Sequence, residues 1–197
     1  MSNIITARVK IKGTRPLLWN AFTPDAIPLK KTEKTGVAGN DPDEWRKRVL
    51  ITKDRQLYVE PTYIFGCLRD AAKHTKKGKG SLQPLITATL QIQDERILTD
   101  RYLPEDGQLN RDPEQPVYLD VRSAKNPSTR AHNVRYRIAA APGWIVTFNI
   151  EWDKTIISRQ EMEAVVIDAG RLTGLGDGRS IGFGRFAVEE FDITADS

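Results

Sequence analysis

The sequence predicts an α+β domain whose core runs strand, helix, strand, strand, helix, strand. Residues 4–12, 86–93 and 144–151 alternate apolar and polar residues with the period of a half-buried strand. A fourth strand is predicted at residues 183–191, after the last helical segment. Apolar residues recur at helical spacing in residues 62–77 and 158–169. This order is the ferredoxin-like (RRM-like) βαββαβ plan, a four-stranded antiparallel sheet with two helices on one face.

The first predicted strand, residues 4–12, has an apolar face and a basic face. Its apolar side chains are Ile5, Ala7, Val9 and Ile11, and its polar ones are Thr6, Arg8, Lys10 and Lys12. Because the helices cover one face of the sheet, the basic face is open to an acidic partner, and Lys10 and Lys12 are candidate RNA contacts. Alternatively, these lysines belong to a solvated edge strand and discourage aggregation.

The first helix is predicted to follow Pro61 and to collect cations at its C-terminal end. The apolar face is Ile64, Leu68, Ala71, Ala72 and Thr75, and the cations are Arg69, Lys73, Lys76 and Lys77. The helix dipole favours cations at this end. It does not explain why the basic run continues through Gly78-Lys79-Gly80, so these four cations are also candidate RNA contacts. The second helix begins with a capping box, Ser158 to Glu161.

Two insertions, at about residues 20–48 and 95–143, interrupt a single domain that spans residues 1–197. In the first, Asp41 and Pro42 suit the N-cap and first position of a short helix, and residues 48–60 suggest a hairpin that turns at residues 53–55. In the second, residues 117–122 and 134–140 alternate well enough to pair as strands. Both insertions exceed the length of ordinary connections, so we expect them to reach a partner.

The second insertion forms a basic arm with aromatic residues at its edges, Tyr118 and Tyr136. Between residues 122 and 137 it has no acidic residue, and its candidate RNA contacts are Arg122, Lys125, Arg130, His132, Arg135 and Arg137. Single-stranded RNA is held by phosphate contacts and base stacking, which such an arm can supply. The alternative is a solvated hairpin.

A glycine-rich loop between the second helix and the last strand is the strongest functional signal. Five glycines fall within eleven residues, from Gly174 to Gly184, and exposed backbone N–H groups beside arginines suit a phosphate. The candidate RNA contacts here are Gly176, Gly178, Arg179, Ser180, Gly182, Gly184 and Arg185. The spacing matches neither a P-loop nor a dinucleotide fingerprint. The alternative is a turn whose glycines serve geometry alone.

Composition narrows the class of protein. The chain has 197 residues, a net charge of +4, one cysteine (Cys67) and two histidines (His74 and His132), so disulfides and Cys- or His-based metal sites are not expected. No apolar run approaches membrane-spanning length. We therefore expect a soluble, cytoplasmic protein with no membrane partner, cofactor or metal.

Three segments together resemble a known family. They are Gly13-Thr-Arg-Pro-Leu17-Leu18, Pro61-Thr-Tyr-Ile-Phe-Gly66-Cys-Leu68-Arg69 and Gly176-Asp-Gly-Arg-Ser-Ile-Gly182-Phe-Gly184-Arg185. In this order they are similar to motifs of the RAMP superfamily of CRISPR-associated RNA-binding proteins, most closely the backbone subunits that polymerise along guide RNA. The glycine-rich segment is the most specific of the three.

The resemblance implies an antiviral ribonucleoprotein: an RRM-like core, a protruding β-hairpin thumb within residues 95–143, and a filament on single-stranded guide RNA. The implied partners are the RNA, other copies of the chain and other subunits of an effector complex. The chain is shorter than many backbone subunits. The loop aspartate of target-cleaving members has no single counterpart, since Asp25, Asp41, Asp43 and Asp54 are all available.

The function expected from the sequence is therefore a non-catalytic RNA-binding subunit of a CRISPR-type complex. One alternative is a RAMP-type endoribonuclease that processes precursor RNA; it would need a general acid–base pair, for which His74 and His132 are the candidates. Another is a general single-stranded nucleic-acid-binding protein, because contacts to the 2′-hydroxyl decide between RNA and DNA.

Overall fold

The computed structural model describes residues 3–26, 41–125 and 132–194. Its main sheet has six strands: β1 (Ile4–Gly13), β3 (Gln56–Val59), β6 (Gln91–Ile92), β7 (Ile97–Tyr102), β10 (Ile145–Asp153) and β11 (Phe186–Thr194). They lie in the order β11-β1-β10-β7-β3, β6 also pairs with β10, and neighbours are antiparallel. The ferredoxin-like order is present: β1, α1, β6–β7, β10, α3 and β11 in the chain give β11-β1-β10-β6/β7 in space.

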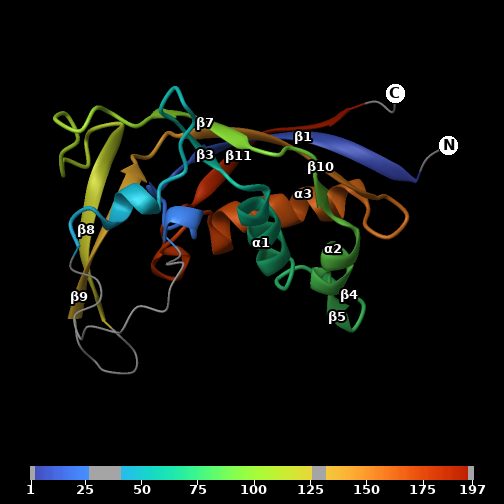
Figure 1. The fold of residues 1–197 in the computed structure, drawn as a ribbon. Helices are drawn as coiled ribbons and strands as arrows, with labels where there is room; N and C mark the ends of the chain where they lie inside the picture. Colours follow the sequence, from blue (N-terminus) through green and yellow to red (C-terminus); the bar gives the residue numbers. More distant parts are fainter. Residues whose placement is uncertain (1–2, 27–40, 126–131, 195–197) are drawn as a thin grey trace.

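The two core helices, α1 (Pro61–Ala71) and α3 (Arg159–Asp168), lie under the same face of this sheet (Figure 1). The predicted capping box begins α3: Ser158 Oγ accepts a hydrogen bond from the Glu161 N–H at 3.3 Å, and Glu161 Oε2 accepts one from the Ser158 N–H at 2.8 Å. The prediction that α1 extends to residue 77 is wrong. After Ala71 the chain turns into a small hairpin of β4 (Lys76–Lys77) and β5 (Gly80–Ser81), so the basic run leaves the helix.

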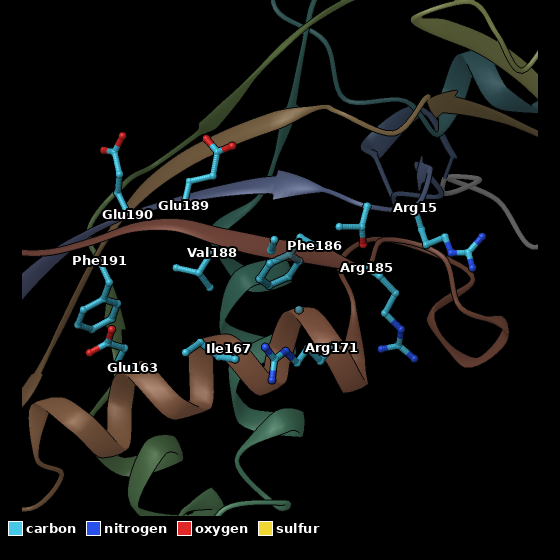
Figure 2. A pocket seen from close by; sticks show the side chains of 13 residues that line it. Arg15, Glu163, Ile167, Arg171, Arg185, Phe186, Val188, Glu189, Glu190 and Phe191 are labelled. Atoms are coloured by element: carbon cyan, nitrogen blue, oxygen red, sulfur yellow. The ribbon is translucent and has the colours of Figure 1, made fainter.

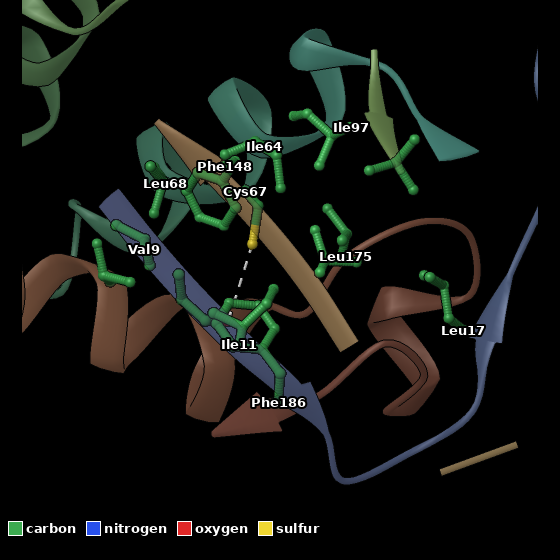
Figure 3. Close-up of a cluster of buried hydrophobic side chains, with 14 of the residues drawn as sticks. Val9, Ile11, Leu17, Ile64, Cys67, Leu68, Ile97, Phe148, Leu175 and Phe186 are labelled. Atoms are coloured by element: carbon green, nitrogen blue, oxygen red, sulfur yellow. Dashed lines mark hydrogen bonds between the residues drawn. The ribbon is translucent and has the colours of Figure 1, made fainter. Parts of the chain in front are cut away.

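The core fills the space between the sheet and the helices. Val9 and Ile11 of β1, Phe148 of β10 and Leu68 of α1 are buried together (Figure 3). Cys67 lies among them, and its thiol donates to the Ala169 carbonyl at 3.9 Å. Burial raises the pKa of this thiol to about 12, so it stays protonated at neutral pH and acts as a small apolar core residue.

Residues 86–93 were predicted as one strand, and this is wrong. Residues Gln83–Thr89 form a helix, α2, which begins with Pro84 in its first turn. Thr87 and Thr89 donate their hydroxyls to the carbonyls of Gln83 and Leu85, each at 2.8 Å, so the polar half of the alternating pattern fits a helix. The second core strand therefore comes later, as β6 and then β7, a segment that was assigned to the insertion.

The predicted hairpin in the second insertion is confirmed and is longer than expected. Strand β8 (Val117–Lys125) pairs with β9 (His132–Ala140), and β2 (Leu17–Leu18) adds a third strand. The hairpin lies to one side of the main sheet (Figure 1). Arg130 and the tip of the hairpin fall outside the described residues.

The short helix expected after Asp41 begins later than predicted. Asp41 Oδ1 accepts the Asp43 N–H at 3.0 Å, and a 3₁₀ turn, Glu44–Lys47, follows. The turn at residues 53–55 is confirmed, with Arg55 at φ 62°, and β3 follows it. In the part of the chain that the structure describes, no helix is long and apolar enough to cross a membrane.

Candidate nucleic-acid interface

The glycine-rich loop is hydrogen-bonded to β2 and to the residue before it. It follows a π-helical turn, Ala169–Thr173, and contains a 3₁₀ turn, Arg179–Ile181. The Gly184 N–H donates to Pro16 O at 2.8 Å, and the Asp177 N–H donates to Leu18 O at 3.0 Å. The segments around residues 13–18 and 174–185 therefore form one unit.

The glycines of the loop are needed largely for close approach. A Cβ on Gly184, at φ +67°, would lie 1.7 Å from Leu175 O, and one on Gly176 would lie 2.6 Å from Leu18 O. Backbone N–H groups of the loop that were expected to face a phosphate donate to carbonyls within the fold. The Leu175 N–H donates to Gly184 O, the Phe183 N–H to Gly178 O, and the Gly184 N–H to Pro16 O. These three N–H groups are therefore not free for a phosphate, and the side chains of the loop remain as candidate anion contacts.

One groove brings together predicted site residues from three distant parts of the sequence. It has a volume of about 830 Å³ and lies between the end of α1, strand β9 and the glycine-rich loop. Lys73 and His74 come from the turn that follows α1, Arg137 from β9, and Arg179, Ser180 and Arg185 from the loop and its end. We call it the loop groove. Four lysine and arginine side chains face two carboxylates there, so cations are in surplus.

The two carboxylates of the loop groove orient its arginines. Arg137 Nε lies 2.8 Å from Asp177 Oδ2, and Arg179 Nη1 lies 3.3 Å from Asp70 Oδ2. Two guanidinium nitrogens of the groove are buried without a hydrogen-bond acceptor in the described structure: Arg185 Nη1, and Arg137 Nε, whose approach to Asp177 Oδ2 is an ion pair without hydrogen-bond geometry. A buried guanidinium nitrogen without an acceptor is costly, and an anionic ligand would satisfy it.

A second groove, of about 550 Å³, shares Gly176, Asp177 and Arg179 with the first. Three aromatic side chains line it: Tyr63 and Phe65 from the N-terminal half of α1, and Phe22 from the segment after β2. We call it the aromatic groove. Burial, followed by the charges of Glu60 and Asp177, raises the pKa of Tyr63 to about 12. Arg69, predicted as an RNA contact, lies at this groove and pairs with Asp70 at 2.9 Å.

The aromatic groove was missed by sequence reasoning. Tyr63 and Phe65 lie within the motif that begins at Pro61, and that motif was the available signal. Phe22 lies in an irregular segment and has no local pattern, although its side chain is 78% exposed. Asp70 and Asp177 were also missed, because their role depends on arginines far away in the chain.

Other residues of the basic arm face different surroundings. Arg122 lies over the Phe183 ring, 4.4 Å from its centroid, and pairs with Asp120 at 2.7 Å. Arg135 pairs with Glu44 at 2.8 Å, and His132 Nδ1 lies 2.8 Å from Ser123 Oγ. Lys125 ends β8. The loop groove is lined by His74 but not by His132, so it does not unite the two candidate acid–base residues.

Three of the predicted lysines have structural partners away from the grooves. Lys10 lies 3.1 Å from Glu190 and 3.3 Å from Glu189, and Lys12 lies 3.9 Å from Glu189. Hydrogen bonds to Glu190 and Glu189 raise the pKa of Lys10. These two glutamates lie on β11, beside β1. Lys77 binds Glu161 at 3.1 Å and Ile156 O at 2.6 Å, while Lys76 is exposed on β4.

A third groove, about 800 Å³, runs along β11 and α3 and differs from the loop groove in how its charges are arranged (Figure 2). Arg15, Arg171 and Arg185 lie toward one end, and Glu163, Glu189 and Glu190 lie toward the other (Figure 2). Glu189 and Glu190 project from the side of β11 away from α3 (Figure 2) and pair with Lys10 and Lys12, so Glu163 is the labelled carboxylate on the α3 side. The arginines and Glu163 thus lie apart in this groove, whereas carboxylates lie beside Arg137 and Arg179 in the loop groove.

Comparisons with known proteins give a similarity of structure. No family model matches the chain, and no curated protein matches its sequence significantly. Among solved structures, a chain in the cryo-EM structure of the Type III-B Cmr-beta bound to cognate target RNA aligns with a TM-score of 0.49 and 14% identity. The alignment covers 96% of this chain and 60% of that chain.

Proposed function

We propose that this chain is an RNA-binding subunit of a CRISPR-type ribonucleoprotein and holds single-stranded guide RNA at the glycine-rich loop. The observation that carries the proposal is the loop groove, where Lys73, Arg137, Arg179 and Arg185 converge from three distant segments. Phosphates bind such groups by charge-assisted hydrogen bonds, and the surplus of cations over carboxylates attracts a polyanion.

The three motifs that resemble the RAMP superfamily meet at this place. The segment from Gly13 to Leu18 accepts hydrogen bonds from the loop through Pro16 O and Leu18 O. The segment from Pro61 to Arg69 forms one wall of the aromatic groove, and the loop forms the other. Motifs that are separate in sequence thus build one surface, which supports the resemblance. Assembly along RNA with other copies and other subunits is part of the proposal.

A salt titration tests the proposal. Labelled single-stranded RNA should bind with an affinity that falls steeply with salt, because phosphate contacts release counterions. Lys73→Ala with Arg179→Ala should weaken binding about tenfold or more, and should make the slope of log affinity against log salt shallower by about 1.4, since each phosphate contact to a single strand contributes about 0.7. Particle mass should rise by one protomer for each fixed increment of RNA length.

The matched control removes the same charge from the open sheet face. Lys10→Ala with Lys12→Ala should change affinity less than about threefold, because these lysines are already paired with Glu189 and Glu190. Binding that is indifferent to salt would overturn RNA binding. Equal losses in the two double variants would overturn the assignment to the loop groove, and cleavage of the RNA would favour the endoribonuclease.

A further inference from the structure

We infer that the aromatic groove is a nucleobase pocket, in which one unstacked base of the bound RNA lies against Phe22 and Phe65. This inference rests on the proposed function and adds a subsite to it. Side chains that suit a base line the pocket: Phe22, Tyr63 and Phe65 offer ring faces, and Asn20 and Thr62 offer hydrogen-bonding groups. Its volume of about 550 Å³ leaves room for a nucleoside.

The pocket lies where a nucleotide held in the loop groove would place its base. Gly176, Asp177 and Arg179 line both grooves, so a single wall separates the cationic surface from the aromatic one. Arginine at that wall can contact a phosphate on one side and stack on a base on the other. Single-stranded RNA is commonly held by this combination of a basic track and aromatic platforms.

Gly66 gives independent support. It lies inside α1, where glycine lowers helix stability relative to alanine, and it has no positive φ that would require glycine. A Cβ at this position would meet nothing within 4 Å, so no neighbouring atom in the described structure excludes a side chain. The residue also lines the aromatic groove. An unexplained glycine in a helix wall is accounted for when that wall must stay clear for a ligand.

The exposure of Phe22 points the same way. The residue is 78% exposed, and the Arg48 guanidinium lies 5.2 Å from its ring centroid. A large apolar side chain at a groove mouth is unfavourable in water, and stacking on a base would remove part of its surface from solvent. Phe22 contributes little to the core, so it can be replaced without unfolding the protein.

The experiment compares intact RNA with RNA that carries one abasic site, moved stepwise along the strand. For the native chain, the abasic site at one register should weaken binding about tenfold, which is the usual effect of losing one stacked base. The Phe22→Ala variant should bind intact RNA about tenfold more weakly than the native chain does. Its affinity should then fall almost no further when the RNA carries the abasic site. The slope of affinity against salt should not change in this variant, because no charge is removed.

Gly66→Ala and Gly66→Val complete the test. Both should block the pocket and weaken binding to intact RNA, while Gly66→Ala should raise the thermal midpoint by about 2 °C, as expected for removing a helix glycine. A weaker binder that is more stable cannot be explained by misfolding. The control is Tyr102→Ala, which removes another exposed aromatic side chain, from a residue 56% exposed on β7 and outside the pocket, and should leave binding unchanged.

The outcomes separate the two claims. If no variant or RNA shows salt-dependent binding, the proposed function fails. If the native chain binds RNA with the expected salt slope, but Phe22→Ala loses as much affinity on abasic RNA as the native chain does, the nucleobase pocket is wrong and the proposed function stands. Unchanged binding by Gly66→Val would also overturn the pocket.

Discussion

Two basic regions that look alike in the sequence have different surroundings in the fold. On the open face of the sheet, Lys10 and Lys12 lie along one strand, and β11 places Glu189 and Glu190 beside them at 3.1–3.9 Å. At the glycine-rich loop, Arg137 and Arg179 also pair with carboxylates, but in a groove that contains further cations. Surplus positive charge in a concave place attracts a polyanion more strongly than cations that are each paired on an open face.

The largest effect, a loss of folding stability, should come from a substitution that distorts the glycine-rich loop beside the loop groove. Gly184→Ala places a Cβ 1.7 Å from Leu175 O at a φ of +67°, so the backbone must move. We expect the free energy of unfolding to fall by about 3 kcal/mol or more, from overpacking and left-handed strain together.

Gly182→Ala is the matched control for Gly184→Ala, because its φ is +93° but its Cβ would meet nothing within 4 Å. It should lose only about 1–2 kcal/mol, from backbone strain alone. Urea unfolding of both variants measures the difference. Equal losses would mean that close packing at Gly184 does not hold the loop.

A smaller effect is expected from releasing the lysines of the open face. Glu189→Gln with Glu190→Gln removes the carboxylates that neutralise Lys10 and Lys12. RNA affinity should rise no more than about threefold, because exposed charges on a flat face are solvated and screened. Titration of labelled RNA at two salt concentrations measures this. A tenfold gain would show that the sheet face is a second RNA surface held in check by its own acids.

The sequence predicted the parts of the fold that depend on local pattern. The alternation of β1 and β10, the Ser158 capping box and the pairing of β8 with β9 were all readable in this way. Helix α2 was not, because Thr87 and Thr89 fit an alternating strand pattern and bond to their own helix backbone. Local patterns also cannot show where a strand such as β7 joins the sheet.

The sequence was enough to predict which residues could contact RNA, but not which of them lie side by side in the fold. The glycine-rich loop and the cations of α1 and β9 could be named, and the structure then placed Lys73, Arg137 and Arg179 at one groove. The carboxylates that pair with the arginines lie far away in the sequence, and so does the acid that neutralises Lys10, Glu190, at 180 residues. Phe22 was missed for the same reason, since only tertiary contact brings it beside Tyr63 and Phe65.

The smallest effect concerns Lys77, which the sequence grouped with the RNA contacts and the structure places against the capping box. The Ser158 N–H lowers the pKa of Glu161 from its ordinary value of 4.5, and the Lys77 ammonium lowers it further. A carboxyl whose pKa is lower in the folded state stabilises the fold above its unfolded pKa, and this contribution is lost as the pH falls through its folded pKa.

Glu161→Gln keeps an acceptor for the Ser158 N–H but removes the charge, so it should reduce the free energy of unfolding by at most about 1 kcal/mol at pH 7, and the two proteins should converge as the pH falls below about 4. Lys77→Ala should reduce it by less, at most about 0.5 kcal/mol, because a partly exposed ion pair is screened. Its RNA affinity should fall less than about twofold, which a titration beside Lys73→Ala measures. A loss for Lys77→Ala that equals the loss for Lys73→Ala would extend the RNA surface past the loop groove to the start of α3. The contrast between paired and surplus cations would then no longer separate the two regions.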